Sequence, residues 1–216
     1  MIDAVVFDLD GVLIDSEQLW DEVREQLARE RGGRWNERAQ ADMMGMSAPE
    51  WSRYMHDVIG LSESPDEINA EVVRRLQARY RERLPLLPGA RQAVERLAAR
   101  WPLGLASSSN RQVIDFVLER AGFAQSFRAT VSSEEVARGK PAPDVYLETA
   151  RRLGIRLDRC VAVEDSRNGI RSARAARMHV VAIPNPHYPP DAPTLGAADV
   201  VLRSLDELTV ERVSAF

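Results

Sequence analysis

The stretch Ile2–Gly11 (IDAVVFDLDG) joins a short apolar run to two aspartates and a glycine. Residues 2–7 are mostly apolar and rich in β-branched side chains, which is typical of a buried parallel strand. Helical patterns separate most of the similar runs that follow. These runs lie at 103–106, 129–131, 160–163 and 179–183, with a weaker one at 199–202. Strands that alternate with helices predict a parallel sheet covered by helices on both faces.

Residues 16–84 interrupt this alternation, because they contain no convincing strand pattern and are predicted to form several amphipathic helices. The sequence therefore predicts two domains. A Rossmann-like α/β core comprises residues 1–15 and 85–216, and a small all-helical domain of residues 16–84 is inserted after the first strand. The two chain crossings lie close together and are expected to form a hinge.

Several residues predict where helices of the core begin and end. Ser109 and Gln112 have the spacing of a capping box, and Gly122 is expected to end that helix. Ser166 is expected to cap a later helix that runs to about Arg177.

The composition excludes several classes of protein. A net charge of -4 and a pI of about 5.5 give no basic surplus for nucleic acid or an anionic membrane surface. No apolar run is long enough to span a membrane, and we expect no signal peptide. Cys160 is the single cysteine, so no internal disulfide is possible and a reducing cytoplasm is expected. The three histidines share no ligand-like spacing.

Polar residues follow the strand runs of the predicted sheet. Asp8 and Asp10 end the first run, and two carboxylates so close together suggest a cation or a shared proton. The segment 107–110 (SSSN) precedes a helix and offers a hydroxyl and free N–H groups to an anion. A proline-flanked loop presents Lys140, which is the only lysine among 29 lysines and arginines. Glu164 and Asp165 can flank a hard cation. All these residues are expected at one sheet edge.

These motifs, in this order, resemble those of the haloacid dehalogenase superfamily over nearly the whole chain. Asp8-x-Asp10-Gly11 matches its first motif, Ser107 its second, Lys140 its third and Glu164-Asp165 its fourth. The helical insertion resembles the cap domain of the β-phosphoglucomutase-like and phosphoglycolate-phosphatase-like subfamily. One departure is Arg177, because relatives usually have a glycine at this helix end.

The resemblance implies a phosphatase that acts on a small phosphorylated metabolite through an aspartyl phosphate on Asp8. Asp10 would protonate the leaving oxygen and then activate water. Mg²⁺ would be held by the Asp8 carboxylate, the Asp10 carbonyl, Asp165 and Glu164, directly or through water. The hydroxyl of Ser107, the N–H of Ser108 and the Lys140 ammonium would hold the phosphoryl group. We expect a monomer.

Substrate choice is expected to depend on the cap domain. The candidate contacts are Glu17, Trp20, Gly45 and Ser47, together with Trp51 and the rest of the loop 43–47. At least two of the large apolar residues among Trp20, Met43, Met46 and Trp51 are expected to serve as the core of that domain instead.

The sequence also raises four alternatives to a phosphatase. Related dehalogenases usually lack the second aspartate and need no metal, and a phosphonatase needs a cap lysine that this chain does not have. Related mutases carry a cap histidine and a cap arginine where this chain has Trp20 and Ala48, although Arg53 is close enough to substitute. A catalytically inactive binding protein does not require the intact motifs.

Overall fold

The core of the protein, in a computed structural model that describes residues 1–36, 38–43 and 46–216, is a six-stranded parallel sheet. The strand order is β3-β2-β1-β4-β5-β6. The strands are β1 (Ala4–Phe7), β2 (Leu103–Ser107), β3 (Phe127–Ser132), β4 (Cys160–Glu164), β5 (His179–Ala182) and β6 (Val200–Val201). This confirms the predicted Rossmann-like α/β fold, and each predicted run corresponds to one strand.

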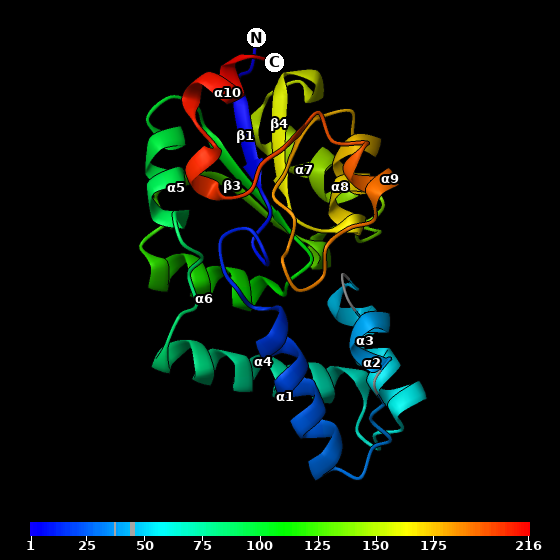
Figure 1. The fold of residues 1–216 in the computed structure, drawn as a ribbon. Coiled ribbons are helices and arrows are strands. Elements are labelled where there is room, and N and C mark those ends of the chain that lie inside the picture. Colours follow the sequence, from blue (N-terminus) through cyan, green and yellow to red (C-terminus); the bar gives the residue numbers. More distant parts are fainter. Residues whose placement is uncertain (37, 44–45) are drawn as a thin grey trace.

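Alternate residues of β1 face two separate hydrophobic cores. Val5 and Phe7 pack into the core shared with α5 (Ala90–Ala98) and α6 (Arg111–Ala121). Ala4 and Val6 pack into the core shared with α7 (Asp144–Leu153) and α8 (Arg167–Ala175). Figure 1 accordingly shows α5 and α6 on one side of the sheet and α7 and α8 on the other. Burying one Val or Phe side chain contributes about 1.5–3 kcal/mol, so both layers stabilise this central strand. The shorter helices α9 (Ala192–Leu195) and α10 (Val210–Ser214) complete the core.

Most of the predicted helix ends are confirmed. Gly122 ends α6 in the left-handed region, with φ 73°, and the Ser166 hydroxyl accepts a hydrogen bond from the Gly169 N–H at the start of α8. The capping role predicted for Ser109 is wrong. Asn110 precedes the first residue of α6, and the Ser109 hydroxyl donates to Asp10 instead. Because the Ser109 hydroxyl makes this hydrogen bond to Asp10, it does not cap α6.

Arg177 adopts the left-handed conformation that its position after α8 demands. Its φ is 62°, and the Arg177 and Met178 N–H groups donate to the carbonyls of Arg174 and Ala173. This hydrogen-bonded helix end favours glycine, because a Cβ atom is crowded at positive φ. The left-handed helix end is therefore kept without a glycine, and the arginine bears the conformational cost.

We expect Arg177→Gly to raise the free energy of unfolding by about 1 kcal/mol, because glycine has no penalty in the left-handed region. Urea unfolding measures this change. The matched control is Arg171→Gly, an exposed position inside α8, which should lower the free energy of unfolding by about 1 kcal/mol. Equal losses at the two positions would contradict the prediction.

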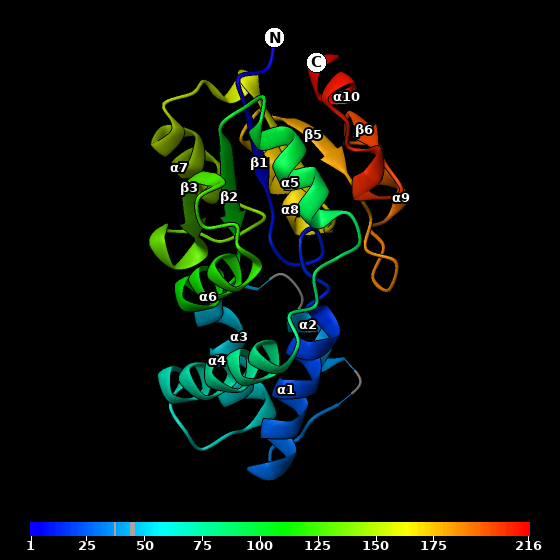
Figure 2. The same ribbon diagram turned by 90° about the vertical axis from the view of Figure 1, so that its left-hand side faces the viewer.

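Residues 16–84 form a separate layer of helices beyond the carboxyl ends of the strands (Figures 1 and 2). These helices are α1 (Glu17–Glu30), α2 (Ala39–Met43), α3 (Ala48–Tyr54), a π-helical turn (Met55–Ile59) and α4 (Pro65–Glu82). We refer to residues 16–84 as the helical segment. Its described residues contain no strand, as predicted.

The helical segment leaves and re-enters the core at one place. Ile14 and Leu86 form an isolated antiparallel bridge. The Asp15 N–H donates to the Pro85 carbonyl at 2.8 Å, and the Leu87 N–H donates to the Leu13 carbonyl at 3.0 Å. The two segments that connect the core to the helical segment, 13–15 and 85–87, are thus hydrogen-bonded to each other.

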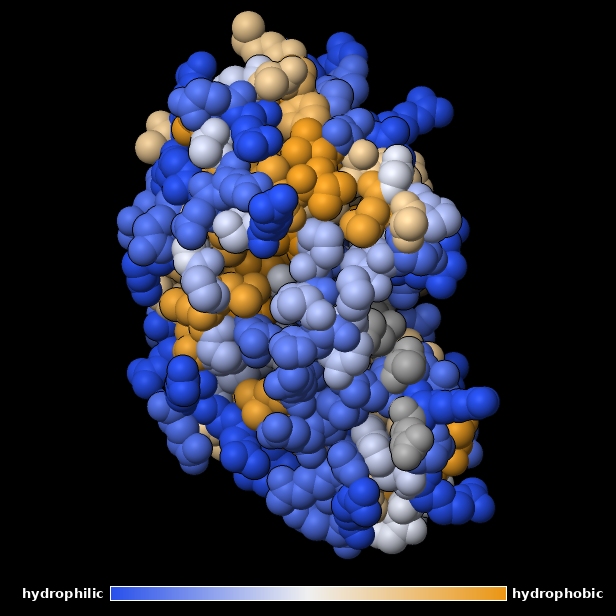
Figure 3. All heavy atoms as spheres, viewed as in Figure 1, coloured by the Kyte–Doolittle hydropathy of each residue, from blue (hydrophilic) through white to orange (hydrophobic). Residues whose placement is uncertain are grey.

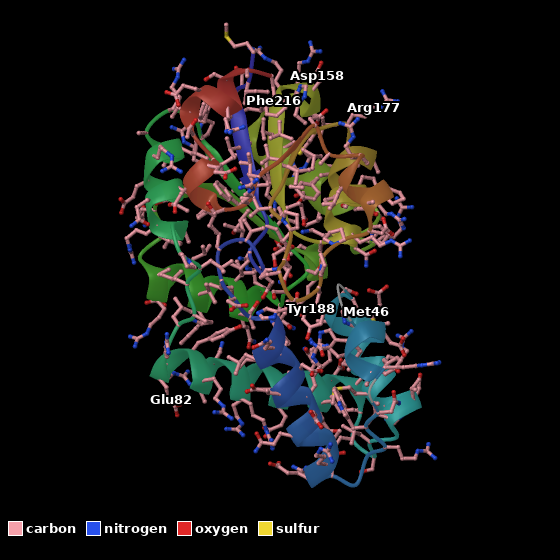
Figure 4. The ribbon with its side chains drawn as sticks, viewed as in Figure 1. Met46, Glu82, Asp158, Arg177, Tyr188 and Phe216 are labelled. Atoms are coloured by element: carbon pink, nitrogen blue, oxygen red, sulfur yellow. The ribbon has the colours of Figure 1, made fainter. Side chains whose placement is uncertain are left out.

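The proline-rich loop between β5 and α9 also contacts the helical segment. The Tyr188 hydroxyl accepts a hydrogen bond from the Gln40 side chain of α2. Figure 4 shows Tyr188 and Met46 at the junction of the two layers. On the face seen in Figure 3, hydrophilic residues cover most of the helical segment, whereas hydrophobic residues gather over the sheet. None of the helices in the described part of the chain combines the length and apolarity needed to cross a bilayer.

Candidate active site

Asp8 immediately follows β1, the strand that pairs with both β2 and β4. Its N–H donates to the Val163 carbonyl of β4 at 3.0 Å, which fixes the backbone at the carboxyl edge of the sheet. The side chain is buried. Open parallel sheets bind ligands at this edge, at the point where the strand order reverses and leaves a crevice.

Lys140 lies between two carboxylates. Its Nζ is 2.9 Å from Asp8 Oδ1 and 2.6 Å from Glu164 Oε1, and all three residues are buried. Burial alone would lower the pKa of Lys140, but the charges of Asp8 and Glu164 outweigh it and hold that pKa above its ordinary value. The lysine is therefore a fixed cation beside Asp8.

Three carboxylates meet at this cluster. Asp8, Glu164 and Asp165 each place an oxygen within 4.8 Å of the others. Burial raises the pKa of Asp8 to about 8, against the opposing charge of Lys140, and burial and Glu164 raise the pKa of Asp165 well above its usual range. One lysine does not balance three buried carboxylates, so the cluster lacks positive charge.

The surroundings of Asp165 fit a divalent cation. Its Oδ1 is buried and accepts no hydrogen bond from the described residues. A Cβ atom on Gly11 would lie 1.9 Å from Asp165 Oδ2, so only glycine lets the first-motif turn pass this carboxylate. Hard cations such as Mg²⁺ and Ca²⁺ take carboxylate oxygens as ligands. Asp8 and Asp165, with Glu164 beside them, can hold such an ion.

Glu164 is fixed by hydrogen bonds on both oxygens. Oε1 accepts from Lys140 and from the Tyr146 hydroxyl, both at 2.6 Å. Oε2 accepts from the Asp165 N–H at 3.1 Å and from the Ser166 N–H at 3.4 Å. A Cβ atom on Gly169 would lie 1.9 Å from the Glu164 carboxylate, so this helix position also requires glycine. These contacts hold the Glu164 carboxylate in one orientation, and the carboxylate in turn fixes the position of the Lys140 ammonium.

Asp10 connects the core to the helical segment. Its Oδ1 accepts hydrogen bonds from the Ser16 hydroxyl at 2.5 Å and the Trp20 indole N–H at 3.1 Å. Its Oδ2 accepts from the Ser109 hydroxyl at 2.6 Å, and the Ser107 hydroxyl lies 3.4 Å away. Donors from the start of α1 and from the end of β2 thus orient this carboxylate.

The serines after β2 form the opposite wall of the site. Ser107 is the last residue of the strand, and its hydroxyl accepts a hydrogen bond from the Ser109 N–H at 3.0 Å. Ser108 is only partly buried, and its carbonyl accepts from the Ser133 hydroxyl at 2.9 Å.

A small pocket of about 50 Å³ lies between the helical segment and Asp10. The segment supplies most of its wall, and Ser108 and Ser109 supply the rest. Burial, with the charge of Asp10, raises the pKa of Glu17 in this pocket to about 7. The residues of the segment that line the pocket are Glu17, Trp20, Arg24, Met43, Met46 and Trp51.

Some of the predicted substrate contacts in the helical segment line this pocket, and others do not. Glu17, Trp20 and Trp51 line the pocket, although Trp20 and Trp51 are also buried and pack against each other with ring centroids 5.9 Å apart. Ser47 does not line the pocket. Its N–H and hydroxyl both donate to Glu50 at the start of α3. Gly45 lies outside the described residues.

Sequence reasoning missed Arg24, Tyr146 and Ser16. Arg24 follows Glu17 and Trp20 on the same face of α1, so its spacing of four from Trp20 was the available signal. Tyr146 carries no comparable signal, because a tyrosine at an inward helix position is normally core. Arg53, the residue considered as a substitute cation, is exposed.

The haloacid dehalogenase-like hydrolase family model matches residues 2–177. The chain therefore belongs to that family, as its motifs indicate.

Two curated relatives are similar over most of their length. Hexitol phosphatase B of Escherichia coli (strain K12) is 36% identical over an alignment of 227 positions, which covers 96% of this chain and 95% of that protein. A phosphorylated carbohydrates phosphatase of Thermotoga maritima is 30% identical over 176 residues, which cover 81% of this chain and 82% of that protein. With the family, these relatives identify the chain as a phosphoric monoester hydrolase.

Solved structures have the same fold. CbbY from Rhodobacter sphaeroides in complex with phosphate has a TM-score of 0.88 at 24% identity, covering 99% of this chain and 100% of that one. A putative β-phosphoglucomutase from Thermotoga maritima has a TM-score of 0.75 at 27% identity, and each chain is covered to 100%. The fold is therefore shared by proteins with different names.

Proposed function

We propose that this protein is a Mg²⁺-dependent phosphatase that hydrolyses the phosphate monoester of a small sugar or polyol through an aspartyl phosphate on Asp8. The observation that carries the proposal is the pairing of Asp8 with Lys140 at 2.9 Å inside a cluster of three buried carboxylates. The hexitol and phosphorylated carbohydrate phosphatases among its relatives support the substrate class.

Asp8 is the proposed nucleophile, and Lys140 holds its carboxylate in position to attack phosphorus. The P–O bond to the leaving group breaks as the bond from Asp8 oxygen to phosphorus forms, and water later displaces Asp8 from phosphorus. Lys140, the Ser107 hydroxyl and the Ser108 N–H stabilise the transferring phosphoryl group, whose charge is greatest in the transition state.

Mg²⁺ would be held by Asp8, Asp165 and the Asp10 carbonyl, with Glu164 as a further carboxylate of the cluster. When bound, it reduces the repulsion between the carboxylate nucleophile and the anionic substrate. Asp165 suits this role because its buried Oδ1 lacks a partner among the described residues.

Asp10 is the proposed general acid and base, and its leaving-group dependence can be tested. We expect Asp10→Asn to lower kcat about 10²-fold for an alkyl phosphate, whose leaving oxygen must be protonated. The loss should be smaller for p-nitrophenyl phosphate, because p-nitrophenolate leaves without a proton. Steady-state kinetics with both substrates measure the difference. Equal losses for the two substrates would exclude the acid role.

We also propose that residues 16–84 act as a cap that closes over the substrate. The Trp20 indole reaches Asp10 across the junction, so closure of this layer orients the acid as it excludes water. The group that leaves with the alcohol would then occupy the pocket lined by Glu17 and Arg24.

A sugar-phosphate mutase is the second candidate function, and Arg24 is the observation that favours it. A mutase must hold a second phosphate at the far end of its substrate, and Arg24 is a buried cation in the pocket beyond Asp10. The absence of a cationic residue at Ala48 and Trp20 is therefore not decisive against a mutase.

One experiment tests both functions. Purified protein is incubated with a panel of phospho-metabolites, with Mg²⁺ and with EDTA, and inorganic phosphate is measured. We expect Mg²⁺-dependent phosphate release from sugar and polyol phosphates. β-Glucose 1-phosphate is included with a trace of glucose 1,6-bisphosphate. Accumulation of glucose 6-phosphate without phosphate release would reject the phosphatase and support the mutase.

A further inference from the structure

Arg24 is a buried arginine held between two aromatic rings. It is 7% exposed, and its guanidinium carbon lies 5.2 Å from the centroid of Trp20 and 5.5 Å from that of Trp51. The two rings belong to α1 and α3 and meet edge to face. A guanidinium over two aromatic faces is stabilised by cation–π attraction and has little freedom to move. Arg24 is thus a fixed donor group.

The guanidinium lacks protein partners among the described residues. It takes part in none of their ion pairs, and its Nε is buried without a hydrogen bond. Buried polar groups nearly always have a partner, since an unsatisfied donor costs free energy. Arg24 also lines the pocket next to Asp10. A ligand in that pocket would supply the missing acceptor.

The charges around the pocket decide what kind of ligand this is. Among the described residues that line the pocket, Arg24 is the one cation, whereas Asp10 and Glu17 carry carboxyl groups. A carboxylate or a second phosphate would be attracted by Arg24 but would lie beside two carboxyl groups. A hydroxyl adds no charge, accepts from the guanidinium and donates to Glu17.

We propose that Arg24 and Glu17 together select phosphate monoesters whose leaving alcohol is a neutral polyhydroxylated chain or ring. The proposal rests on the phosphatase function proposed above and specifies how that site chooses its substrate. The Trp20 and Trp51 rings hold the guanidinium, and Glu17, seven residues earlier on the same face of α1, supplies the acceptor. Substrates that carry a carboxylate or a second phosphate are disfavoured, because the described lining of the pocket offers an anion one cation beside two carboxyl groups.

The kinetic test compares three probes that differ in the leaving group. Mannitol 1-phosphate has hydroxyls, phosphoglycolate has a carboxylate, and p-nitrophenyl phosphate has neither. We expect Arg24→Met to lower the ratio of kcat/KM for mannitol 1-phosphate over p-nitrophenyl phosphate about 10- to 100-fold, which is the loss of a charge-assisted hydrogen bond. Arg24→Lys should fall between, because it keeps the charge but loses the planar fork.

Two further variants sharpen the result. At pH 8, above the pKa of about 7 that burial gives Glu17, Glu17→Gln should raise the ratio for phosphoglycolate over p-nitrophenyl phosphate about 3-fold or more, because one repelling charge is removed. Arg29→Met is the matched control, since this arginine lies on the same helix with a side chain that is 69% exposed, and its ratios should equal those of the wild type. Near-UV circular dichroism checks that the tryptophan packing survives in each variant. If Arg24→Met loses that signal, Arg24→Lys and Glu17→Gln decide the outcome.

A binding measurement distinguishes this proposal on substrate selection from the proposed phosphatase function. Calorimetry on Asp8→Asn protein, with and without Arg24→Met, measures affinity for mannitol 1-phosphate without turnover. We expect about 10-fold or greater weakening when Arg24 is replaced. Unchanged affinity and unchanged kinetic ratios would overturn the proposal. A greater dependence on Arg24 for phosphoglycolate than for mannitol 1-phosphate would overturn it too, because Arg24 would then be an anion site. Selective binding without phosphate release would reject the phosphatase function alone.

Discussion

Replacing Asp8 with asparagine should lower kcat about 10⁴-fold or more, because an amide cannot attack phosphorus and the reaction loses its covalent step. Asp8 Oδ1 lies 2.9 Å from the Lys140 ammonium, so the side chain is already held in place. Single-turnover and steady-state phosphate release measure the loss. Mass spectrometry must show that the asparagine has not deamidated to aspartate. Retained turnover in intact Asp8→Asn protein would exclude Asp8 as the nucleophile.

The same variant should keep its fold. Burial raises the pKa of Asp8 from 3.8 to about 8, so the metal-free folded protein favours the neutral acid. The stabilising contribution of that proton is complete below pH about 4 and is lost as the pH rises through about 8. A neutral asparagine avoids this loss. We therefore expect the Tm of Asp8→Asn at pH 8 in EDTA to equal or exceed that of the wild type. Asp3→Asn, just before β1, is the matched control for activity.

Replacing Lys140 with arginine should lower kcat/KM about 10³-fold although the positive charge is kept. The ammonium lies within 2.9 Å of both Asp8 and Glu164, and the Tyr146 ring centroid is 5.2 Å away. A guanidinium is broader and planar, so it cannot make the same two contacts in a slot that is closed to solvent. Steady-state kinetics with Mg²⁺ measure the effect.

Arg138→Lys is the matched control for this variant. Arg138 lies two residues before Lys140 in the same loop, is exposed and pairs with Asp144. Its exchange should leave kcat/KM within about twofold of the wild type, because surface ion pairs contribute little. Near-normal activity in Lys140→Arg would mean that the only lysine of the chain has no special role in the site.

The sheet edge that carries the candidate site could be predicted from sequence, because parallel strands bring their carboxyl ends together. Asp8, Ser107 and Glu164 each end or follow a strand run, so their meeting follows from the sheet alone. Lys140 and Asp165 come from loops next to those strands. Their burial could not be predicted, since lysine and aspartate are usually exposed.

The contacts made across the two layers could not be predicted, because they depend on how the helical segment packs on the core. Ser109 has a capping-box pattern, yet its hydroxyl binds Asp10, which is brought there by the turn at Gly11. An arginine in an amphipathic helix is normally expected to face solvent. Arg24 is enclosed between two rings only because α1 packs against α3. No local pattern encodes such a pairing of distant segments.

The bridge between Ile14 and Leu86 has a consequence for how this architecture can change over time. Since both ends of residues 16–84 meet at one point beside β1, a longer, shorter or unrelated piece of chain could be spliced in there without altering strand order or register. The α/β core and the helical segment can therefore diversify independently, with the core motifs held constant while new inserts are exchanged at a single junction.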